Sequence, residues 1–124
     1  MFVVDDKTGD LKLHQGDSGE YIVTGLPDNK DGASIYFEVQ DAKRKTVGAQ
    51  IPSVISNGST TFKFTPALTN LMTVKLSEET AEYYGGIKIC TENGDEETIK
   101  VGDKQDGERI IITVLPKEAE GVKQ

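Results

Sequence analysis

The chain has few of the residues on which most catalytic and metal sites depend. Its 124 residues include one cysteine, one histidine and no tryptophan. A single cysteine excludes an intrachain disulfide, and one cysteine with one histidine cannot supply the ligands of a zinc site. A catalytic triad would depend on His14 alone, for which a partly exposed structural role is the simpler expectation. The sequence therefore predicts no enzymatic activity, no metal and no cofactor.

Long apolar runs are also missing. No stretch approaches the roughly 18 apolar residues of a membrane span, and "MFVVDDKTGD" lacks the basic start and apolar core of a signal peptide. Fourteen lysines and arginines stand against 21 aspartates and glutamates, and the formal net charge of −7 repels phosphate backbones and anionic lipids. We therefore expect neither nucleic acid nor a membrane as a partner.

The acidic loops do not have the spacing of a calcium site. An EF-hand loop needs oxygen ligands before a central glycine and a glutamate after it. With Gly32 as that glycine, Pro27 falls at the first ligand position, and with Gly107 there, Lys104 falls at the third. These segments are expected to be solvated turns.

Alternation of apolar and polar residues is the main pattern that the chain does contain. This period of two indicates strands. Clear examples are "SIYFEVQ" and "TTFKFT", whose isoleucine, phenylalanine and valine residues fall on one face. The predicted strands cover residues 19–25, 34–40, 60–65, 83–90 and 108–115, with shorter ones at 45–51, 72–76 and 97–101.

Turn signals separate these strands. Asn57-Gly58 is expected to join residues near 54 to residues near 62, and Asn93-Gly94 to join the strand ending at Cys90 to one beginning near Glu96. Helix signals are limited to one turn at "TPALTNLM", capped by Thr65, and to residues 77–83.

These elements predict an all-β, antiparallel, immunoglobulin-like sandwich with at most one or two short helical turns. Residues 11–116 would form the domain. Residues 1–10 are expected to be a flexible N-terminal segment, and residues 117–124 a charged C-terminal tail or linker.

Apolar residues on the second face of the predicted strands mark a candidate docking face. If the alternate residues fill the core, the residues that should meet water are Tyr36, Tyr84, Cys90, Ile111 and Leu115. Clustered exposed apolar and aromatic side chains usually mark a contact site. The alternative is that a loop such as residues 66–82 folds over this face.

The order of "LHQGDSGEYIV", "SIYFEVQDAKRKTVG", "FTPALTNL", "YYGGIKI" and "ERIIITVLP" resembles the N-terminal immunoglobulin-like module of phage baseplate upper proteins and related tail proteins. The matching positions are a Gln-Gly-Asp turn, a middle strand and a late strand, at Gln15, Gly16, Asp17, Phe37, Val39, Tyr84, Gly86, Ile87 and Lys88. The resemblance extends over about residues 11 to 116.

The resemblance implies a non-catalytic structural module that docks on other proteins of a phage or prophage tail or baseplate, or on a second copy. The expected location is the virion, or the bacterial cytoplasm during assembly. A stand-alone carbohydrate- or cell-surface-binding module is the alternative, although sugar platforms depend on exposed aromatic rings and only 6% of these residues are aromatic.

Overall fold

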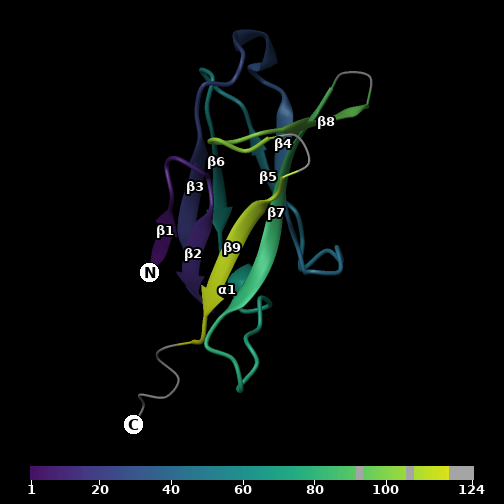
Figure 1. Ribbon diagram of the computed structural model, residues 1–124. Coiled ribbons are helices and arrows are strands. Elements are labelled where there is room, and N and C mark those ends of the chain that lie inside the picture. The colour runs from purple at the N-terminus through teal and green to yellow at the C-terminus, as the bar shows by residue number, and fades with distance from the viewer. Residues whose placement is uncertain (92–93, 106–107, 118–124) are drawn as a thin grey trace.

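The computed structural model describes residues 1–91, 94–105 and 108–117, in which the strands form two facing layers (Figure 1). The expected all-β sandwich is confirmed. The elements in the described residues are β1 (Phe2–Val4), β2 (Leu11–His14), β3 (Gly19–Val23), the 3-10 turn η1 (Asp28–Lys30), β4 (Ser34–Gln40), β5 (Ile51–Val54), β6 (Thr60–Phe64), α1 (Pro66–Thr69), β7 (Ala81–Cys90), β8 (Glu96–Ile99) and β9 (Ile110–Leu115).

The larger layer is a sheet with the strand order β1-β2-β9-β7-β4-β5. The long strand β7 divides one of its edges between two partners, because its residues 81–85 pair with β9 and its residues 87–90 pair with β8. Strand β2 runs parallel to β9, whereas the other strand pairs of this layer are antiparallel in the described residues. The sheet is therefore mixed, which differs from the wholly antiparallel expectation.

The smaller layer consists of β3 and β6, paired from Gly19 opposite Phe64 to Val23 opposite Thr60. Its two strands correspond to strands B and E of an immunoglobulin sandwich, and β4, β7 and β9 correspond to C, F and G.

The Asn57-Gly58 turn carries the chain from one layer to the other. Both residues have the positive φ that a type I′ turn requires, 53° and 74°. The turn links β5 to β6 as expected, yet β5 pairs with β4 and β6 pairs with β3. The second expected turn does connect two paired strands, β7 and β8, although Asn93 lies outside the described residues.

The core lies between the layers and is formed by the inward parity of the predicted strands. Phe37 is at its centre and is fully buried. Edge-on ring contacts surround it, with centroid distances of 5.3, 5.7 and 5.1 Å to Tyr21, Phe62 and Phe64. The other large buried residues include Leu13, Ile35, Val39, Ile55, Met72, Ile87, Ile89 and Ile112.

Helix α1 closes the end of the sandwich opposite β8 (Figure 1). As predicted, Thr65 caps it by accepting a hydrogen bond from the Leu68 amide at 3.3 Å, and Pro66 occupies its start. The second expected helical turn, at residues 77–83, is instead loop followed by the start of β7 at Ala81. No helix in the described residues is long and apolar enough to cross a membrane.

Three further expectations need correction. Residues 45–50 do not form a strand, because Arg44 and Gly48 have positive φ, and among the described residues they form only the bridge between Thr46 and Gln40; Ile51 is the first residue of β5. Residues 72–76 alternate in polarity but pair with no strand of the described residues. The segment expected to be flexible, residues 1–10, contains β1, which pairs with β2 while Phe2 packs on Phe64 at a centroid distance of 5.3 Å.

Candidate interaction surface

All five residues of the predicted docking face lie on the outer side of the larger sheet, and all five are half-buried. They form two groups. Tyr84 and Ile111 are directly paired across β7 and β9, with Leu115 further along β9. Tyr36 and Cys90 occupy diagonal positions on β4 and β7, because Tyr36 pairs with Lys88 and Cys90 with Ser34. Tyr36 pairs with Lys88, four positions from Tyr84 along β7, so the groups are about 13 Å apart at 3.3 Å per residue.

Arg109 covers Tyr84, the aromatic residue of the group on β7 and β9. The guanidinium carbon lies 4.0 Å from the ring centroid, a cation–π contact. The Tyr84 hydroxyl donates to Glu82 Oε1 at 3.0 Å. This hydrogen bond and partial burial raise the pKa of Tyr84, although Arg109 acts in the opposite direction. Arg109 Nη1 is buried and has no hydrogen-bond partner among the described residues.

In the group formed by Tyr36 and Cys90, the Tyr36 side chain is held by a carboxylate from β8. Its hydroxyl donates to Glu96 Oε2 at 2.7 Å, and Lys88 Nζ lies 3.5 Å from Glu96 Oε1. Burial and then the hydrogen bond to Glu96 raise the pKa of Tyr36 to about 12. The phenol is therefore neutral at physiological pH and its orientation is fixed by a charge-assisted bond.

A hollow of about 250 Å³ lies between the two groups. It exists because Gly86 has no side chain and nothing lies within 4 Å of where its Cβ would be. Glu38 is directly opposite Gly86 in the β4–β7 register. The remaining lining side chains are polar or charged and belong to Tyr36, Gln40, Arg44, Lys88, Thr98 and Arg109.

The segment proposed as a cover, residues 66–82, packs at the end of the sandwich and into its core. Leu68 and Met72 are buried, and Val74 packs against the core. Thr73 contributes a carbonyl that accepts from the Tyr83 hydroxyl at 2.7 Å, and Tyr83 belongs to the core-facing parity of β7. These contacts give the segment a role in closing the core.

Sequence reasoning missed Gly86, Glu96 and Arg109 as parts of this surface. Gly86 and Arg109 could have been found from parity, since they alternate with Tyr84 and Ile111 on their own segments. Glu96 could not, because its contact with Tyr36 depends on β8 and β4 flanking the same strand.

His14 ends β2 and lies beside Asp17, with Nδ1 3.8 Å from Asp17 Oδ2. Burial tends to raise the pKa of Asp17, but hydrogen bonds from the N-terminal amine and the His14 amide lower it overall. Cys90 lies on the outer face next to Tyr36, as predicted from parity. Across the described residues, no three His, Cys, Asp or Glu side chains come close enough to hold a metal ion.

Comparison of the chain with protein-family models, with curated proteins and with solved structures finds no match.

Proposed function

We propose that this chain is a non-catalytic structural domain that binds another protein through the outer face of β4, β7 and β9. The observation that carries the proposal is the Tyr84–Ile111 pair. Both are large side chains on the solvent side of a sheet, paired in register and half-buried, with Leu115 on the same side four positions further along β9. Aromatic residues and arginine are enriched at protein interfaces and among the residues that dominate binding energy.

The hollow at Gly86 gives this face a shape suited to docking. A side chain of a partner entering it would meet the Tyr36 edge on one side and Arg109 on the other. Tyr36 and Tyr84 each have their hydroxyl hydrogen bonded, so they lose little rotamer freedom when a partner binds. Charged groups at the rim, Glu38 and Lys88, would set register and orientation.

The biological setting that we propose is a phage or prophage tail or baseplate. It is supported by the resemblance in strand and turn order described above. The partner would be another tail or baseplate protein, or a second copy of this chain, in the virion or during assembly in the bacterial cytoplasm.

Co-purification with the proteins encoded by the neighbouring genes tests the proposal, which expects tail or baseplate proteins among them. We expect one of them to bind the wild-type chain, or sedimentation equilibrium to show a mass that rises with concentration. Gly86→Lys should abolish that interaction while leaving the fold intact, since nothing lies within 4 Å of where its Cβ would be and the longer side chain would extend into the hollow. Lys63→Glu, an exposed change on β6 of the other layer, is the control and should bind normally.

A strict monomer that binds none of these proteins would contradict the proposal. So would an interaction that Gly86→Lys leaves unchanged. Binding of the chain to an array of bacterial surface glycans, with no binding to tail proteins, would instead support a stand-alone carbohydrate-binding module. Against that alternative, Arg109 already covers a face of the Tyr84 ring on which a sugar would stack.

A further inference from the structure

Strand β3 has an unpaired edge. Over residues 19–23 it pairs with β6, and in the part of the chain that the structure describes no strand pairs with its other side. In antiparallel pairing, alternate N–H and C=O groups of a strand point away from its partner. An edge of this kind is a template for an added strand unless it is covered or carries protective charges or prolines.

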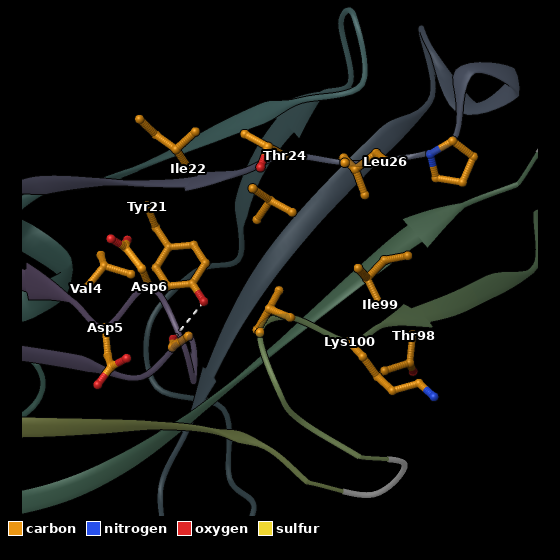
Figure 2. Close-up of a pocket in the computed structure, with 16 residues that line it drawn as sticks. Val4, Asp5, Asp6, Tyr21, Ile22, Thr24, Leu26, Thr98, Ile99 and Lys100 are labelled. Carbon is orange, nitrogen blue, oxygen red and sulfur yellow. Dashed lines mark hydrogen bonds between the residues drawn. The ribbon is translucent and has the colours of Figure 1, made fainter.

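A groove of about 600 Å³ lies beside this edge (Figure 2). One wall is formed by residues 22–27, from β3 towards η1, and the other by residues 98–102, which follow β8. Residues of the N-terminal loop close one end beside Tyr21, whose hydroxyl donates to the Gly9 carbonyl at 2.7 Å.

The groove exists because the edge strands of the larger sheet stop short. Strand β2 pairs only with residues 112–115 of β9, at the far end of the sandwich. At the groove, the larger layer is bordered by the segment after β8, which is fixed to the N-terminal loop by the Asp103 amide donating to the Lys7 carbonyl at 2.9 Å. The two layers therefore separate here without a strand between them.

The side chains in the groove define what would bind. Its lining is mostly polar and includes Thr24, Thr98 and Lys100, and its apolar side chains include Val23, Leu26, Ile99 and Val101. Its closed end carries Asp5 and Asp6, as Figure 2 shows. Backbone amides of Thr8 and Lys7 hydrogen bond to Asp5 and lower its pKa, so this carboxylate stays charged. Asp6 is exposed to solvent.

We infer that the free edge of β3 and this groove bind an extended peptide segment as an added antiparallel strand. Alternate apolar residues of the segment would face Val23 and Ile99, and a lysine or arginine would lie beside Asp6. A strand in the groove has walls of this chain on both sides, so it cannot also be paired within the sheet of another folded domain. A folded second copy therefore does not fit. This site shares only Thr98 with the lining of the Gly86 hollow and does not depend on the function proposed for the outer face.

The occupant's direction fixes where the charge belongs. Tyr21, at the acidic end, precedes Leu26 along the chain, so an antiparallel strand places its C-terminal end beside Asp6. The probe is therefore acetyl-VTVTVK-amide, titrated into the ¹⁵N-labelled full chain. We expect the amide signals of residues 21–24 and 99–101 to shift, with a Kd below about 1 mM.

Two controls separate strand addition from adventitious contact. The same peptide with every valine and threonine nitrogen methylated cannot donate backbone hydrogen bonds to the β3 edge and should not bind. Asp6→Lys should weaken binding of the lysine peptide by about two- to fivefold and strengthen binding of acetyl-VTVTVE-amide by a similar factor, in the range of surface ion pairs. Glu20→Lys, the same charge change on β3 outside the groove lining, is the matched control variant.

Binding that follows this pattern supports the inference. It is overturned if no signals shift at millimolar peptide, if the N-methylated peptide binds equally well, or if the shifts map to the outer face around Tyr84.

Discussion

The contact between Gly85 and Phe37 allows the packing of the core to be tested quantitatively. Gly85 lies in β7 directly over the buried Phe37 ring. A methyl group at position 85 would lie 2.5 Å from Phe37 Cζ and 2.7 Å from Cε1, about 1 Å inside a normal carbon–carbon contact. Overpacking of this kind costs about 1 to 3 kcal/mol, so Gly85→Ala should lower the free energy of unfolding by that amount.

Phe37→Leu removes the cause of this clash at a separate cost. The ring makes three edge-on contacts, with Tyr21, Phe62 and Phe64. Each such contact contributes about 0.5 to 1.5 kcal/mol beyond area burial, so the substitution should cost about 2 to 4 kcal/mol. Leucine lacks the Cζ and Cε atoms, which leaves room for the alanine methyl. In the double variant the cost of Gly85→Ala should therefore fall by about 1 to 3 kcal/mol.

Urea unfolding followed by far-ultraviolet circular dichroism measures all four proteins, with equal m-values as the check that only stability changes. Gly86→Ala is the control, since no atom lies within 4 Å of its added methyl, and it should change stability by less than about 0.5 kcal/mol. Additive costs in the double variant, or a neutral Gly85→Ala, would refute this account of the core.

Three further predictions concern individual polar contacts. The folded-state pKa of Tyr36 is raised to about 12, so its neutral phenol contributes stability that is complete below about pH 10 and is lost as the pH rises towards 12. Tyr36→Phe should flatten this alkaline loss of stability, measured by urea unfolding at each pH. Asp10 Oδ1 accepts from the Ile111 amide and from Lys104 Nζ, each at 2.9 Å, so Asp10→Ala should cost about 2 to 3 kcal/mol in the same assay. Thr65→Ala removes the cap of α1 and should cost about 1 kcal/mol, whereas Thr65→Ser should retain most of the stability.

The outer face shows how much of the candidate surface the alternation of residues along the strands could predict. Counting alternate residues placed Tyr84 and Ile111 on one face, and they are paired in register. It also placed Cys90 on that face, but could not show that the face divides around Gly86. That division depends on the register of β7 with both neighbouring strands.

The sequence by itself determined the elements whose signals are local. Alternation predicted the inward parity of β4, β6, β7 and β9, and Thr65-Pro66 predicted α1, because side-chain direction and capping depend on neighbours within a few residues. Asn57-Gly58 predicted a turn for the same reason.

Only the tertiary structure decided which strands pair. Nothing local indicates that β5 and β6 enter different layers, that β2 runs parallel to β9, or that β3 has an edge beside a groove with which no described strand pairs. A strand pattern specifies which face is buried but not which edge is hydrogen bonded, since backbone groups are the same in every residue except proline. Pairing is therefore chosen by the packing of the whole core, with Phe37 and its three aromatic neighbours joining the two layers.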